Sequence, residues 1–246
     1  YLRIAALALL ITAMTRPRTV DVSTQTKKTE GIDIVMAIDV SASMLARDLK
    51  PNRLEALKNV ASDFIKKRVN DRIGLVVYSG ESYTKTPVTS DKSIALTALD
   101  ELSYTQNIKG GTAIGMGLAT SVNRLKDSKA ESKVIILLTD GVNNSGFIDP
   151  KTATELAISE GIKTYSIGIG TKGEAMSPVS ISRGGKINYK PVEVKIDEEL
   201  LQYIAEQTGG NYYRATNREK LDEIYESINK LEKTVIEEKK FYDYQE

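Results

Sequence analysis

The stretch IDIVMAIDVSASM, residues 32–44, decides the fold, because an apolar strand in it runs directly into a cluster of polar side chains. Residues 32–38 are almost continuously apolar, which is typical of a strand buried on both faces of a parallel sheet. Asp39, Ser41 and Ser43 then follow at alternate positions. We therefore expect one carboxylate and two hydroxyl groups at the carboxyl end of a buried strand.

Apolar strands and amphipathic helices alternate about six times along the rest of the chain, which predicts an α/β fold. The expected architecture is a Rossmann-like, doubly wound, mostly parallel sheet with helices on both faces. Further strands are expected at residues 73–78, 134–138, 164–169 and 211–214. Helices are expected at 53–69, 93–102, 113–125, 152–160, 197–207 and from an N-cap at Asn217 to about 232. The glycine- and proline-containing stretch 173–195 predicts an inserted extended loop or β-hairpin.

Composition excludes several kinds of function. The 246 residues are 41% hydrophobic and contain neither cysteine nor histidine. A cysteine or histidine zinc site and a Ser-His-Asp triad are therefore ruled out. The formal net charge of +1 argues against a general nucleic-acid binder, which would normally carry an excess of basic residues.

The chain begins with Tyr1 rather than methionine, and we expect it to be part of something longer. Residues 4–15, IAALALLITAMT, are apolar and allow three interpretations: a buried helix, a signal-peptide core or the second half of a transmembrane helix. The lack of a polar face favours a truncated transmembrane segment over residues 1–18. A linker at 19–31, the main domain at 32–233 and a linker at 234–246 leading to a further membrane helix complete the expected organisation. Arg16 and Arg18 alone favour a cytosolic domain but are too few to fix its orientation.

Two further motifs deliver polar side chains to the same edge of the predicted sheet. GGTAIG, residues 110–115, offers Thr112 at the start of a helix, and LLTDG, residues 137–141, offers Asp140 at the end of the most apolar strand. Each such residue taken singly is an ordinary capping or turn residue. Two carboxylates buried together would be costly without a cation, and oxygen-only ligands suit a magnesium-like ion. The sequence thus predicts a metal site formed by Asp39, Ser41, Ser43, Thr112 and Asp140.

These five residues resemble the metal-ion-dependent adhesion site of von Willebrand factor A (VWA) domains, whose pattern is DxSxS, a distant Thr and a distant Asp. The residue between the serines is often glycine in that family and is Ala42 here. The resemblance extends from about residue 31 to residue 231. It implies that Ser41 and Ser43 bind the ion directly and that Thr112 does so when a partner is engaged. Asp39 and Asp140 act directly or through water, and one coordination position stays open for a Glu or Asp of a protein partner.

Within that family the chain looks like the bacterial BatA-type aerotolerance proteins. The stretches that carry the likeness are KPNRLEALK, NDRIGLVVYSGESYT, GTAIGMGLATSVNRLKDSK and VIILLTDGVNNSG. The resemblance implies an inner-membrane protein with flanking membrane helices and a periplasmic VWA domain, against the weak charge signal of Arg16 and Arg18. It also implies a role in aerotolerance or envelope stress, with other Bat-type VWA proteins and a MoxR-like AAA ATPase as partners. Mg²⁺ is the expected ion, with Mn²⁺ or Ca²⁺ as alternatives.

Two features of the sequence could indicate an enzyme or a nucleotide-binding protein, but a non-enzymatic interaction module is favoured. IGIGTKG, residues 167–173, has the GxGxxG spacing of a dinucleotide site, but no helix is expected to begin there. A magnesium-dependent phosphohydrolase would need a base and a cation for the phosphate. The chain has no histidine, no basic residue lies within the metal motifs, and Arg47 and Lys50 are expected only to flank them. A scaffold module with a purely structural metal stays open.

Several polar residues near the predicted site could contact a partner or could simply be loop residues. They are Asn143, Asn144 and Ser145 after Asp140, and Ser79, Glu81, Tyr83 and Thr84 after the second strand. Four tyrosines near the insertion and the last strand are expected to pack in the core or at its edge: Tyr189, Tyr203, Tyr212 and Tyr213.

Overall fold

The computed structural model describes residues 4–6, 31–104, 110–181 and 187–242. Most of the expected membrane segment 1–18 and of the linker 19–31 therefore lies outside the described residues. No helix in the described part of the chain is both long and apolar enough to cross a membrane.

A six-stranded sheet forms the centre of the domain, in the strand order β3-β2-β1-β4-β5-β8. The strands are β1 (Asp33–Asp39), β2 (Arg72–Tyr78), β3 (Ser82–Thr89), β4 (Lys133–Thr139), β5 (Lys163–Ile169) and β8 (Tyr212–Ala215). All neighbouring strands pair in parallel except β2 and β3. The strand order reverses between β1 and β4, and an open α/β sheet binds its ligands at such a switch point.

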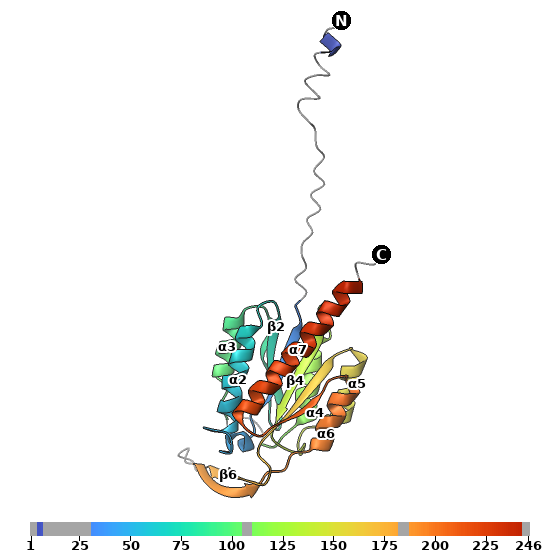
Figure 1. Ribbon diagram of the computed structural model, residues 1–246. Coiled ribbons are helices and arrows are strands. Elements are labelled where there is room, and N and C mark those ends of the chain that lie inside the picture. The colour runs from blue at the N-terminus through green and yellow to red at the C-terminus, as the bar shows by residue number, and fades with distance from the viewer. Residues whose placement is uncertain (1–3, 7–30, 105–109, 182–186, 243–246) are drawn as a thin grey trace.

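Helices cover both faces of the sheet, as expected (Figure 1). One apolar cluster joins the sheet to α2 (Arg53–Lys67), α3 (Lys92–Asp100) and α7 (Arg218–Tyr242). The other joins the opposite face to α4 (Ile114–Leu125), α5 (Pro150–Ser159) and α6 (Glu198–Gln207). Alternate residues of β1 belong to different clusters, with Met36 and Ile38 in the first and Val35 and Ala37 in the second. This alternation explains why the strand is apolar at nearly every position.

The edge strand β3 is not predicted by the sequence pattern. We expected Tyr83 and Thr84 to lie at the rim of the site, whereas both belong to β3 and pair with Val77 and Val76 of β2. The strand reads SYTKTPVT, and only one of its eight residues is buried. An edge strand needs few apolar side chains and can accommodate a proline, so it lacks the apolar run that marks the central strands.

The expected insertion is a β-hairpin, formed by β6 (Glu174–Ile181) and β7 (Ile187–Glu193) in antiparallel pairing. It forms a separate two-stranded sheet that projects from the end of the domain (Figure 1). The GxGxxG stretch leads into strand β6 and not into a helix, so it lacks the helix N-terminus that a dinucleotide site requires.

The last helix is longer than expected. Its start is as predicted, because the Asn217 side chain accepts a hydrogen bond from the backbone N–H of Lys220 at 2.7 Å. The helix continues to Tyr242, about ten residues beyond the expected end near residue 232. Residues 234–242, which we expected to belong to a linker, are therefore helical.

Candidate metal centre

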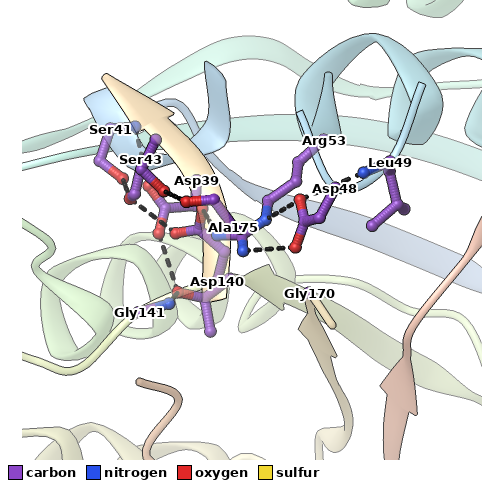
Figure 2. Close-up of polar contacts among 12 residues, drawn as sticks. Asp39, Ser41, Ser43, Asp48, Leu49, Arg53, Asp140, Gly141, Gly170 and Ala175 are labelled. Atoms are coloured by element: carbon purple, nitrogen blue, oxygen red, sulfur yellow. Dashed lines mark hydrogen bonds and ion pairs between the residues drawn. The ribbon is translucent and has the colours of Figure 1, made fainter. Parts of the chain in front are cut away.

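The turn after β1 brings Asp39, Ser41 and Ser43 together (Figure 2). A short 3-10 helix, η1 (Ala42–Leu45), reverses the chain immediately after Ser41. Asp39 Oδ1 accepts a hydrogen bond from the backbone N–H of Ser41 at 2.8 Å, and its Oδ2 accepts one from Thr139 Oγ1 at 2.8 Å. Both oxygens of Asp39 are thus held in fixed directions, one by its own turn and one by the neighbouring strand β4.

The hydroxyl groups of the two serines link this turn to Asp140. Ser43 Oγ donates to Asp140 Oδ1 at 2.7 Å, and the Ser41 and Ser43 oxygens are 2.9 Å apart. A hydroxyl group has one proton, so Ser43 gives its proton to Asp140 and Ser41 is the donor to Ser43. Four of the five predicted site residues therefore form one connected group at the carboxyl ends of β1 and β4.

Thr112 approaches the same group from the loop before α4. A Cβ atom placed on Gly141 would lie 3.4 Å from Thr112 Oγ1, which puts this hydroxyl next to the residue that follows Asp140. Asn144 Oδ1 accepts from the Thr112 N–H at 2.9 Å. The backbone carbonyl oxygen of Ser79 accepts a hydrogen bond at 2.6 Å from the backbone N–H of Ala113, the residue after Thr112.

Three residues that we expected at the rim thus have structural roles in holding the threonine loop. Besides Asn144 and Ser79, Asn143 accepts the backbone N–H of Ile114 on its side-chain oxygen at 2.8 Å. These bonds fix the start of α4 against the loop that follows β4. They position Thr112.

The two carboxylates of the site are buried close together, which makes their ionised forms unfavourable. Asp39 and Asp140 have exposed fractions of 0% and 2%. Burial, followed by the nearby charge of Asp140, raises the pKa of Asp39 to about 7. Burial also raises the pKa of Asp140, although the Arg53 guanidinium opposes this shift. A bound divalent cation would neutralise both groups and so make their ionised forms favourable.

Arg53 is the principal site residue that the sequence analysis missed. Its side chain extends from the first residue of α2, and its Nη1 lies 2.8 Å from Asp140 Oδ2 (Figure 2). Its Nε and Nη2 contact the two oxygens of Asp48 at 2.8 and 2.6 Å. The metal motifs themselves contain no basic residue, and the sequence did not reveal Arg53 because Arg53 and Asp140 are 87 positions apart and meet only in the folded chain. Thr139 was also missed, although it directly precedes Asp140.

The donor set fits a hard divalent cation. Two carboxylates and the hydroxyls of Ser41, Ser43 and Thr112 supply only oxygen, which Mg²⁺, Mn²⁺ and Ca²⁺ prefer. The described residues contain no group of three or more His, Cys, Asp or Glu side chains that could hold a metal. An ion held here would consequently depend on hydroxyl groups for part of its coordination.

Comparison with known proteins establishes the family. The von Willebrand factor type A domain matches residues 33–227, and the chain belongs to this family. An uncharacterized protein of Borreliella burgdorferi is 36% identical over 184 residues, covering 74% of this chain and 53% of the relative. A UPF0353 protein of Mycolicibacterium paratuberculosis is 31% identical over 211 residues, covering 82% and 60%. The chain thus spans little more than half of the curated relatives that it matches.

Solved structures extend the likeness to Bat-type proteins. BatB from Bacteroides thetaiotaomicron is 31% identical with a TM-score of 0.71, covering 82% of this chain and all of the solved one. An aerotolerance-related membrane protein from Bacteroides fragilis is 30% identical with a TM-score of 0.69, covering 81% and 98%. Domains of this type are generally interaction modules.

A more distant structure is that of proximal thread matrix protein 1 from the mussel byssus. It has a zinc-occupied metal-ion-dependent adhesion site. It is 24% identical to this chain with a TM-score of 0.63, and the match covers 82% of this chain and 45% of that protein. At this level of identity the likeness supports the fold alone.

Proposed function

We propose that this domain binds Mg²⁺ through Asp39, Ser41, Ser43, Thr112 and Asp140, and binds a protein partner through a Glu or Asp that completes the ion's coordination. The observation that carries the proposal is the burial of two carboxylates beside hydroxyl oxygens at the switch point of the sheet. Their raised pKa values mean that the fold holds them together at a cost. A divalent cation removes the repulsion between the two carboxylates, and this gain contributes to the free energy of ion binding.

The hydroxyl groups determine how much negative charge the ion meets. Ser41, Ser43 and Thr112 are neutral ligands, so the two carboxylates just balance a divalent charge. An ion held in this way keeps a position that a partner's carboxylate can fill.

The cellular setting is proposed from the relatives. Proteins described as BatB and as an aerotolerance-related membrane protein are similar to nearly the whole domain. On this basis we place the domain in the periplasm of a bacterial inner-membrane protein that acts in aerotolerance or envelope stress. Its partners would be other Bat-type VWA proteins and a MoxR-like AAA ATPase. These assignments rest on family association.

Arg53 reopens the question of phosphoryl transfer, because a cation beside a magnesium site could hold a phosphate. Its side chain is only 3% exposed and is already bound by Asp48 and Asp140. A phosphate would have to displace one of these carboxylates. The geometry therefore supports the interaction module over the phosphohydrolase.

Calorimetric titration of MgCl₂ and MnCl₂ into the purified chain tests the proposal. We expect one binding event that is lost in Asp39→Ala. Asp100→Ala, at the exposed end of α3, is the matched control and should bind as the unmodified chain does. Binding that persists in Asp39→Ala would contradict the assigned site. Capture of a carboxylate-bearing partner that persists in EDTA would favour a scaffold with a structural metal.

A further inference from the structure

The guanidinium of Arg53 contacts Asp140 of the proposed metal centre and lies beside Gly170, shortly before the β6–β7 hairpin (Figure 2). It donates through Nε and Nη2 to the two oxygens of Asp48 and through Nη1 to Asp140 Oδ2. All three distances lie between 2.6 and 2.8 Å, the range of strong charge-assisted hydrogen bonds. Arg53 is thus shared between two carboxylates that would otherwise be independent.

Asp48 holds Arg53 on the side away from the serines. Asp48 Oδ2 also accepts hydrogen bonds from the backbone N–H of Thr171 at 3.0 Å and from its hydroxyl at 3.3 Å. Burial would raise the pKa of Asp48, but the hydrogen bonds from Arg53 and Thr171 outweigh it and lower that pKa. Asp48 is therefore a fixed anion, and it keeps the arginine in one orientation.

Gly170 closes the other side of the guanidinium. Its backbone has φ +144°, and a Cβ atom there would lie 2.8 Å from Arg53 Nη2. Arg214 binds the carbonyl oxygens of Gly170 and Thr171 at 3.3 and 2.8 Å, which fixes this segment from behind. The packing leaves Arg53 little freedom to leave Asp140.

The position of Arg53 has a consequence for any cation at the centre. The guanidinium occupies Asp140 Oδ2 and repels a positive ion, while Ser43 donates to Asp140 Oδ1. Asp140 therefore offers an incoming cation less negative charge than a free carboxylate would. A cation whose charge the protein neutralises only in part attracts an additional anion more strongly than a fully neutralised one does.

We infer that Arg53 is a positioning residue that restrains Asp140, weakens the domain's own hold on the ion and thereby keeps the ion receptive to a partner's carboxylate. This inference rests on the proposed function. It adds that one side chain, Arg53, sets the ratio of ion affinity to partner affinity. It predicts that the two affinities change in opposite directions when the charge of Arg53 is removed.

The test measures Mn²⁺ and acetate binding to the full chain. Mn²⁺ binding is followed by electron paramagnetic resonance, and acetate binding to the Mn²⁺-loaded protein by loss of water-proton relaxation enhancement. In Arg53→Met we expect Mn²⁺ to bind about tenfold more tightly, because one positive charge near the ion is gone. Acetate should bind several-fold more weakly. Arg53→Lys keeps the charge and should stay within about threefold of the unmodified chain in both measurements.

A merely structural role for Arg53 gives a different pattern, in which both affinities fall together with the melting temperature. That pattern, or unchanged affinities in Arg53→Met, would overturn the inference. Because Arg53→Met leaves Asp48 buried without its partner, the double variant Arg53→Met/Asp48→Asn is measured beside it. In the double variant acetate affinity must still fall relative to Mn²⁺ affinity, and an unchanged ratio counts against the inference. Failure of the unmodified chain to bind Mn²⁺ would instead contradict the proposed function.

Discussion

The two ends of the sheet treat their buried acids differently. At the amino ends of the strands, Glu232 of α7 is 0% exposed and is bound by Lys163 at 2.8 Å, Tyr165 at 2.6 Å and Ser132 at 3.0 Å. At the carboxyl ends, Asp39 and Asp140 lie together, and the single guanidinium of Arg53 that contacts Asp140 is shared with Asp48. The protein supplies its own cation to Glu232 at the first end, whereas at the second end the proposed metal ion would neutralise the two acids. This difference separates an acid that stabilises the fold from acids that are suited to binding.

The largest expected effect comes from removing Glu232, the buried acid at the amino ends of the strands. Glu232→Ala leaves Lys163 and the buried Tyr165 hydroxyl without their shared acceptor. We expect the free energy of unfolding to fall by about 3 kcal/mol, measured by urea denaturation with or without Mg²⁺. Glu226 also lies on α7 and forms an exposed ion pair with Lys67 of α2, and Glu226→Ala should leave the urea midpoint unchanged. Equal effects of the two variants would contradict the role assigned to Glu232.

A smaller effect is expected from protonating Asp39 at the carboxyl ends of the strands. Metal ligands must be deprotonated, and the pKa of Asp39 is raised to about 7 by burial and by Asp140. The affinity for Mg²⁺ should therefore fall about tenfold or more between pH 7.5 and pH 5.5. Calorimetry at the two pH values, in buffers of different ionisation enthalpy, should also detect proton release on binding. A pH-independent affinity would mean that Asp39 is already ionised before the ion arrives.

The smallest effect concerns stability without metal. Because the pKa of Asp39 is raised from 3.8 to about 7 on folding, the stability of the metal-free fold should fall as the pH rises from about 4 to about 7 and stay low above that. Asp39→Asn removes the negative charge but also one of the two oxygens that accept hydrogen bonds from Ser41 and Thr139, so in EDTA at pH 8 the variant should be only about 1 kcal/mol more stable than the unmodified chain. The advantage should disappear below pH 4, where Asp39 is protonated in both states. Destabilisation at pH 8 would show that hydrogen bonds to Asp39 outweigh its charge.

The sequence predicts the central strands and the meeting of the site residues because both follow from local patterns. Apolar runs identify β1, β2, β4 and β5, and polar residues directly after such runs must lie at one edge of the sheet. The edge strand β3 escapes this reasoning because its mostly half-buried side chains carry no apolar pattern. Pairing with β2 decides its conformation.

The contact between Arg53 and Asp140 could not be predicted from local patterns. An arginine at the start of a helix, shortly after a proline, looks like an ordinary surface residue. Its burial depends on Asp48 and on the absence of a side chain at Gly170. These conditions are set by tertiary packing between α2, β4 and β5.

The placement of β1 bears on how the domain would carry mechanical load. β1 begins at the end of the domain where α7 also finishes (Figure 1), and it leads directly into Asp39 and the serines at the other end. Tension between the chain before β1 and a partner held at the metal centre would run along this strand. Hydrogen bonds to β2 and β4 flank β1 on both sides and lie across that direction. They would have to break together in shear, so the strand that leads into Asp39 is held on both sides against being pulled out.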